Sequence, residues 1–452
     1  MTEQGDKNME RFAIRGHICY SEDQKKIRTV DRGYVVCEEG KSRGVFETLP
    51  EEWRGIPCRD YGDKLIIPGL VDLHVHAPQY TFRGLGMDRE LIDWLNTHTF
   101  PEEEKYKDTA YAKKAYNIFI DDLLHSATTR ACVFASCHKE ATLWLMKKME
   151  EAGLAGYVGK VNMDRNSSQG LQEESAQKSA QDTEAWILAA AGLTNVRPIL
   201  TPRFIPTCSD ELMEKLSELQ KKYRLPAQSH LSENLSEIEW VRQLCPQASC
   251  YGDAYRLHGL FGGACPTIMA HCVYSDEEET RMMKEQGVFI AHCPESNANL
   301  ASGIAPARRF LDQGLKMGLG TDVAAGTSLS MFRAMAMAVQ CSKLRWRIQD
   351  ESLAPLTVEE VFYLATKGGG EFFGKVGSLE PGYEFDAVVI DDTMLRHARK
   401  LSAKERLERL IYLGEDRHIQ AKYIKGKQVL PIEKTAGDKR WKTNIWPRSY
   451  LF

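Results

Sequence analysis

The sequence has no hydrophobic run long enough to cross a membrane, no excess of positive charge and no dense cluster of cysteines. No segment reaches the roughly 18 apolar residues of a transmembrane helix, so we expect no membrane partner. The 59 basic and 63 acidic residues give a net charge of −4, which excludes the basic surface typical of nucleic-acid-binding proteins. The opening segment, MTEQGDKNMERFAIRG, lacks the apolar core of a secretory signal.

The twelve cysteines are spread along the whole chain of 452 residues. Several of them, such as Cys132, Cys272 and Cys293, lie inside apolar runs. Without a secretory leader, such cysteines are typical of buried, reduced thiols rather than of disulfides. We therefore expect a cytoplasmic protein whose substrate or ligand is a small molecule.

Length and composition indicate a large folded protein. Apolar residues make up 43% and charged residues 27% of the chain, which is ordinary for a globular protein. At roughly 150 residues per domain, the length fits about three units, or one large barrel with an accessory domain.

Both ends of the chain alternate apolar and polar residues, which predicts short strands joined by turns. The pattern appears in RFAIRGHICYS and RTVDRGYVVCEEG near the start, and in EFDAVVIDD and AKYIKGKQVL near the end. Because chain ends often lie close together in a domain, we expect residues 1–68 and 373–452 to build one small β-sandwich. Residues 433–452 are expected to form a tail on the body or on a second subunit.

The middle of the chain, residues 69–372, alternates apolar runs with amphipathic segments. The amphipathic segments SDELMEKLSELQKKY and SDEEETRMMKEQ both begin with Ser-Asp, which predicts helix N-caps. Eight strand–helix repeats predict an α/β fold, a (β/α)8 TIM-like barrel. The eight apolar runs are GLVDLHVH, TTRACVFAS, AGYVGKVN, VRPILTPRF, LPAQSHLSE, TIMAHCVY, GVFIAHCP and KMGLGTDV.

Histidines stand at the ends of several of these predicted strands, among them the first and the fifth. The first run ends in His74-Val75-His76, and the alternation of a strand puts both imidazoles on one face. The fifth run contains His230 at its end. Since the carboxyl ends of barrel strands meet at one mouth, we expect these three imidazoles to lie close enough to hold one metal ion.

Further polar residues follow the same predicted strand ends. His271 ends the sixth run, Asp322 follows the eighth, and Glu233 stands three residues after the fifth-strand histidine. Each residue alone has an ordinary explanation, because a lone buried histidine is usually a core residue and Asp322 could cap a turn. Their coincidence at successive strand ends favours a metal site. Histidine and carboxylate ligands suit both zinc and iron.

Several motifs resemble those of the amidohydrolase superfamily. PGLVDLHVH, HLSE, AHC and GTD occur here in the order in which that superfamily carries them at its strand ends. The longer segments GLVDLHVHAPQY, DWLNTHTFP, TPRF, SHLSEN, AHCPESN and GLGTDVAAG resemble the guanine deaminase family within it, across nearly the whole barrel. This resemblance implies hydrolysis of guanine to xanthine and ammonia, in a homodimer.

The resemblance also implies a role for particular residues. It implies one zinc ion held by His74, His76, His230 and Asp322. It implies that Glu233 and Asp322 move protons, and that His271 orients the metal-bound water. It implies purine contacts from Gln79, Arg203 and Phe204 beside the metal site, with Trp94 lining the pocket. Residues 77–105 are our candidate for a lid.

Two alternatives stay open at this point. A related enzyme could act on another aminated ring, such as 8-oxoguanine, cytosine, an adenosine derivative or a triazine. A scaffold relative without activity is the second alternative, although such relatives typically lose metal ligands. Arg203, which follows a proline at a strand end, could instead form a surface ion pair.

Overall fold

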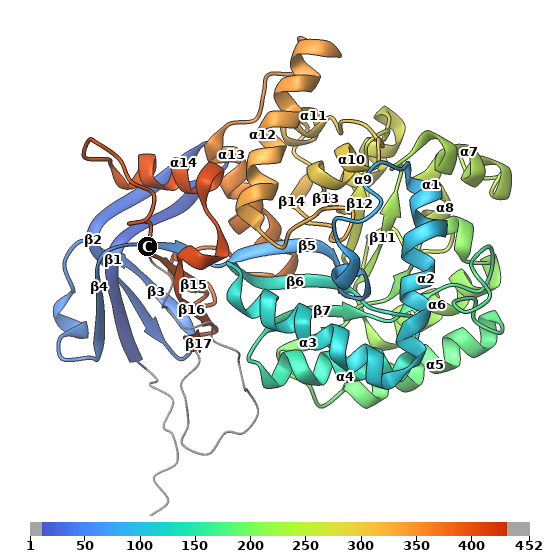
Figure 1. The fold of residues 1–452 in the computed structure, drawn as a ribbon, viewed down its shortest axis with the longest axis horizontal. Helices are drawn as coiled ribbons and strands as arrows, with labels where there is room; N and C mark the ends of the chain where they lie inside the picture. Colours follow the sequence, from blue (N-terminus) through green and yellow to red (C-terminus); the bar gives the residue numbers. More distant parts are fainter. Residues whose placement is uncertain (1–10, 432–452) are drawn as a thin grey trace, which may run out of the picture.

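The computed structural model describes residues 11–431, in which a β-sheet built from both chain ends adjoins an α/β region (Figure 1). The predicted C-terminal tail, residues 433–452, lies outside the described residues. Within the described part, no helix is both long and apolar enough to pass through a bilayer.

Strands from both ends of the chain form one seven-stranded sheet, in the order β17-β16-β15-β4-β1-β2-β3. Antiparallel pairing of β4 with β15 joins the two ends, with Ile66 opposite Val389. Alternate residues such as Ile14 and Ile18 are fully buried and pack in a cluster with Phe385. The strands are β1 Arg11–Asp23, β2 Lys26–Glu38, β3 Lys41–Phe46, β4 Cys58–Pro68, β15 Ala387–Ile390, β16 Ile419–Ile424 and β17 Lys427–Leu430.

Two four-stranded parallel sheets form the α/β region, in the orders β5-β6-β7-β9 and β11-β12-β13-β14. Most residues of their strands are buried, which explains the nearly continuous apolar runs in the sequence. The predicted α/β class with parallel strands is confirmed. The strands are β5 Leu70–His76, β6 Thr128–Phe134, β7 Ala155–Gly159, β9 Val196–Pro198, β11 Ala227–Leu231, β12 Thr267–His271, β13 Phe289–His292 and β14 Lys316–Leu319, with a short pair β8 Val161–Asn162 and β10 Thr201–Pro202.

Backbone contacts link the two parallel sheets at both junctions. On one side, a single parallel bridge joins Leu200 to Ala227 at the start of β11. On the other side, the Asp322 N–H donates to the His74 carbonyl over 2.8 Å, and the His76 N–H donates to the Val323 carbonyl over 3.0 Å. The second junction therefore brings the end of β5 beside the segment that follows β14.

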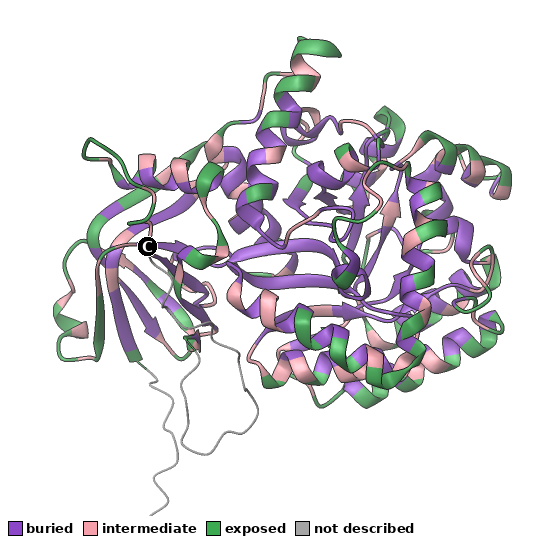
Figure 2. Cartoon of the chain, in the orientation of Figure 1, coloured by how far each residue is buried: buried purple, intermediate pink, exposed green. Residues whose placement is uncertain are grey.

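Helices cover the outside of the parallel sheets, with exposed residues facing outwards and buried residues facing the strands (Figure 2). Both predicted N-caps are present, since Ser209 accepts from the Leu212 N–H and Asp276 accepts from the Glu279 N–H. The helices are α1 Leu91–Trp94, α2 Phe100–Glu103, α3 Thr109–His125, α4 Lys139–Glu151, α5 Ala176–Ala190, α6 Asp210–Tyr223, α7 Leu235–Leu244, α8 Tyr251–Leu257, α9 Glu277–Gln286, α10 Pro294–Asn299, α11 Ala307–Asp312, α12 Met331–Ile348, α13 Val358–Tyr363 and α14 Ala403–Leu413.

A buried ion pair connects the parallel sheet to the sheet made from the chain ends. Arg130 of β6 lies 2.8 Å from Asp386, which directly precedes β15, and the two side chains are 2% and 0% exposed. Removing one partner of such a pair leaves the other charge buried without compensation. We predict that Arg130→Ala lowers the free energy of unfolding by about 3 to 5 kcal/mol, measured by urea denaturation.

The control for this prediction is Arg54→Ala, which removes an exposed pair with Glu51. Surface pairs contribute less than about 1 kcal/mol, so this variant should unfold like the parent. Equal effects of the two substitutions would contradict a structural role for the buried pair.

Candidate active site

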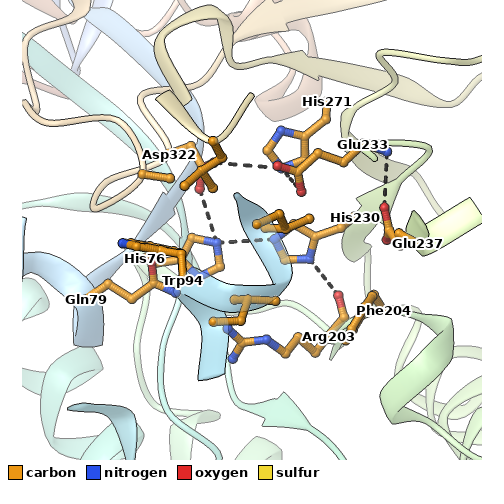
Figure 3. Close-up of a pocket in the computed structure, with 14 residues that line it drawn as sticks. His76, Gln79, Trp94, Arg203, Phe204, His230, Glu233, Glu237, His271 and Asp322 are labelled. Carbon is orange, nitrogen blue, oxygen red and sulfur yellow. Dashed lines mark hydrogen bonds and ion pairs between the residues drawn. The ribbon is translucent and has the colours of Figure 1, made fainter. Parts of the chain in front are cut away.

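A cavity opens at the carboxyl ends of the parallel strands (Figure 3). Every predicted site residue lines it except His74, which is completely buried beside it. The structure therefore brings together residues that are far apart in the chain. His76 and Asp322, for example, are 246 positions apart. The predicted residues in its wall are His76, Gln79, Trp94, Arg203, Phe204, His230, Glu233, His271 and Asp322.

Four donor atoms from three strand ends face one another at the bottom of the cavity. The Nε2 atoms of His74 and His76 are 3.2 Å apart, and those of His76 and His230 are 3.3 Å apart. Asp322 Oδ1 lies 3.2 Å from His74 Nε2 and 3.3 Å from His76 Nε2. A tetrahedron with zinc–nitrogen bonds of the usual length has edges of about 3.3 to 3.4 Å, so these four distances are close to those that such an ion requires.

The three imidazoles have the protonation state that a metal ligand needs. Burial lowers the pKa of His76 to about 4, lowers that of His74, and takes that of His230 well below its ordinary value. Each ring is therefore neutral at neutral pH. The His230 Nδ1 donates to the Arg203 carbonyl over 2.6 Å, which leaves the lone pair of Nε2 directed at the other donors.

Asp72 in β5 fixes the relative position of the strand ends that carry these ligands. Its Oδ1 accepts from the His74 N–H over 3.1 Å and from the Thr321 N–H over 3.0 Å. Thr321 directly precedes Asp322, whose φ of 48° lies in the sparsely populated left-handed region. The sequence reasoning missed Asp72, although an aspartate inside the apolar strand LVDLHVH was an available signal.

Glu233 and His271 lie on the side of the cavity away from the His76 ring. His271 Nε2 is 3.5 Å from Glu233 Oε2 and 3.7 Å from Asp322 Oδ2. Burial, reinforced by the Asp322 carboxylate, raises the pKa of Glu233 to about 8. The Ser302 hydroxyl donates to Glu233 Oε1 over 3.1 Å, so this carboxyl is held in a defined orientation.

Arg203, Phe204 and Gln79 form another part of the wall. Arg203 is only 3% exposed and faces the cavity, so the alternative of a surface ion pair is wrong. Its guanidinium is paired with Glu103 at the end of α2, and the same carboxylate accepts from Gln79. The sequence reasoning did not single out Glu103, because its partners are 24 and 100 positions away.

The candidate lid, residues 77–105, covers one side of the cavity. It includes the short helices η2 Ala77–Phe82 and η3 Leu95–Thr99 together with α1 and α2. Leu91, Trp94 and Leu95 from this segment line the cavity, and the Trp94 Nε1 donates to the Leu85 carbonyl over 3.1 Å. The segment therefore supplies apolar surface beside the polar donor set.

Two further residues support the site without having been predicted. Glu237, on α7 and four positions after Glu233, lines the cavity and accepts from the Tyr251 hydroxyl over 2.7 Å. Asn297 Oδ1 lies 2.9 Å from His271 Nδ1. The i,i+4 spacing of the two glutamates was visible in the sequence, whereas the contact of Asn297 depends on the path of the chain after β13.

Comparison with known proteins agrees with this geometry. The model of the amidohydrolase family matches residues 65–429. Mouse guanine deaminase is 37% identical over 435 residues, which cover 93% of each chain, and the Escherichia coli guanine deaminase is 35% identical over 89% of this chain and 92% of its own.

A solved structure is also similar over nearly its whole length. The guanine deaminase of C. acetobutylicum, with guanine bound in its active site, superposes with a TM-score of 0.90 at 45% identity, covering 92% of this chain and 99% of that one. The family match covers every residue of the donor set and of the cavity wall. This chain belongs to the amidohydrolase family.

Proposed function

We propose that this protein is a guanine aminohydrolase, which converts guanine and water to xanthine and ammonia. The observation that carries the proposal is a His/Asp donor set and a buried arginine in the wall of one cavity. Guanine deaminases at 35–37% identity, and a relative crystallised with guanine, support the choice of substrate. The reaction is a hydrolysis of a carbon–nitrogen bond.

We propose that the donor set holds one divalent ion, for which zinc fits best and iron is a second choice. The distances of 3.2 to 3.3 Å between donor atoms support zinc, as does the neutral state of the imidazoles. When bound, such an ion lowers the pKa of a coordinated water from 15.7 to about 7. The proposed ligands are His74, His76, His230 and Asp322.

The proton transfers are assigned to the chain's own carboxylates. Asp322 accepts a proton from the attacking water, which His271 orients through its Nε2. The Glu233 carboxyl gives its proton to the ring nitrogen next to C2, which makes that carbon electrophilic. A bond forms between C2 and the water oxygen. Asp322 then passes the proton that it accepted to the amino nitrogen, and the bond from C2 to that nitrogen breaks, which releases ammonia. The hydroxyl on C2 gives its proton to the Glu233 carboxylate as it becomes the carbonyl of xanthine.

The proposed specificity rests on hydrogen-bond complementarity. Arg203 has only donors, which match the O6 carbonyl of guanine, whereas adenine carries an amino group at that position. An amino group there would leave buried donors unpaired, which can reduce the rate by several powers of ten. Phe204 and Trp94 supply apolar walls for a flat ring, and Gln79 supplies a polar contact.

We also propose the finer architecture that the sequence predicts. Residues 69–372 form a (β/α)8 barrel in which the two parallel sheets close on each other, supported by the backbone contacts at both junctions. Residues 1–68 and 373–452 form a β-sandwich, supported by the shared seven-stranded sheet. Twelve cysteines without a disulfide support a cytoplasmic location, and the family resemblance supports a homodimer.

The direct test is ultraviolet monitoring of guanine conversion, with metal quantified on the same sample. The proposal expects loss of guanine absorbance with release of one ammonia per guanine consumed. Release of ammonia from another ring but not from guanine would identify a different aminohydrolase. No turnover together with no bound metal would favour the scaffold alternative.

The metal site generates a separate prediction. His76→Asn removes one of four donors, so we expect metal content to fall from about one to below about 0.2 per chain. Elemental analysis of the purified protein measures this. His397→Asn, at an exposed histidine outside the cavity, is the control and should keep its metal; full metal content in the His76 variant would contradict the assigned ligand.

The role of Glu233 can be separated from metal binding. Glu233→Gln keeps the shape and the Ser302 contact but cannot release a proton. We expect normal metal content with a roughly 10²- to 10⁴-fold lower kcat, measured by ammonia release. Glu239→Gln, at an exposed position of α7, the helix that follows Glu233, serves as the control, and wild-type turnover in the Glu233 variant would refute its role as proton donor.

A further inference from the structure

Glu103 is a buried carboxylate that the proposed mechanism does not use. It ends α2, and its side chain is 2% exposed. Its Oε1 accepts from the Gln79 Nε2 over 2.9 Å and from the Arg203 Nη2 over 3.2 Å, while its Oε2 accepts from the Arg203 Nη1 over 2.6 Å. One carboxylate therefore contacts both polar residues assigned to purine binding.

The first consequence concerns the amide of Gln79. A carboxylate only accepts hydrogen bonds, so the nitrogen of the Gln79 amide must face Glu103. On the other side, the Ala324 N–H donates to the Gln79 Oε1 over 3.3 Å. Both neighbours require the same orientation, and a rotated amide would place donor against donor at Ala324 and acceptor against acceptor at Glu103.

The second consequence concerns the charge of Arg203. The bidentate contact uses one N–H from each terminal nitrogen of Arg203 and compensates a cation that is almost completely buried. The ring of Phe100, also in α2, lies 5.2 Å from the guanidinium carbon. The short helix α2 thus contacts the guanidinium in two ways, through the carboxylate of Glu103 and through the ring of Phe100.

We propose that Glu103 is the positioning residue that sets substrate specificity, by fixing which hydrogen-bond donors and acceptors Arg203 and Gln79 present to the ring. With both residues held in this way, the site favours a purine with a carbonyl rather than an amino group opposite Arg203. The inference rests on the proposed function, because it concerns the same substrate and the same cavity.

Two substitutions at Glu103 distinguish this role from simple space filling. Glu103→Gln keeps the size but replaces one oxygen by an NH2 group. Since each oxygen accepts from at least one donor, either orientation of the new amide places donor against donor. Glu103→Asp keeps two acceptor oxygens but is shorter by one methylene. If Glu103 acts as a hydrogen-bond acceptor, guanine binding is weaker in the Gln variant than in the Asp variant. If it only fills space, guanine binding is weaker in the Asp variant.

The neighbouring Glu102 provides a matched control. Its carboxylate accepts from the hydroxyls of Thr81 and Tyr111 and pairs with Lys105, and it does not line the cavity. Glu102→Gln therefore changes a carboxylate on the same helix, one position away, without changing the contacts of Arg203 or Gln79.

The experiment compares wild-type protein, Glu103→Gln, Glu103→Asp and Glu102→Gln. It measures kcat and KM for guanine, the inhibition constant of 2,6-diaminopurine, metal content and thermal stability. In Glu103→Gln we expect the KM for guanine to rise roughly ten- to hundredfold, with a smaller change in kcat, little change in diaminopurine inhibition and full metal content. Glu103→Asp should be intermediate, and Glu102→Gln should stay within about twofold of wild type.

Two results would overturn the inference: an unchanged KM for guanine in Glu103→Gln, or a greater loss in Glu103→Asp than in Glu103→Gln. If the Gln variant does not fold, the Asp variant decides. A raised KM for guanine with unchanged inhibition by 2,6-diaminopurine supports the inference, whereas an unchanged KM, or an equal loss of affinity for both ligands, overturns it. Absence of guanine turnover in the wild-type protein contradicts the proposed function itself, so the two failures are distinct.

Discussion

The contact of the Asp322 carboxylate with the imidazoles of His74 and His76 is the constraint around which this site is built. It joins the segment after β14 to the end of β5, at distances of 3.2 and 3.3 Å. With His230 added, three neutral nitrogens direct lone pairs at one another and at an anion. Such an arrangement is favourable only around a cation, so the fold and a bound metal would stabilise each other.

Buried carboxylates surround this donor set, and we propose that each one holds a different part of the site in place. Asp72 holds the backbone of the strand ends, and Glu103 holds the side chains of the substrate wall. Glu237 accepts from the Glu233 N–H over 3.2 Å and so fixes the loop that carries the proposed proton donor. Each of these acids is satisfied by hydrogen bonds or an ion pair, which is what makes its burial tolerable.

The parts of this picture that follow local rules could be predicted from the sequence. The alternation in LVDLHVH predicts two imidazoles on one face, and Ser209 before an amphipathic run predicts a helix start; both are present. Glu103 could not be predicted in this way, because its role depends on how the segment between β5 and α3 folds back over the cavity. The register shifts in the seven-stranded sheet, such as the one between Gly16 and Ile18, likewise depend on tertiary packing.

Anomalous diffraction at the zinc edge, from crystals of the metal-loaded protein, tests directly whether the four donors share one ion. We expect one peak per chain, within about 2.0 to 2.2 Å of the Nε2 atoms of the three histidines and of a carboxylate oxygen of Asp322. A peak elsewhere, or a peak that contacts none of the β5 histidines, would contradict this expectation.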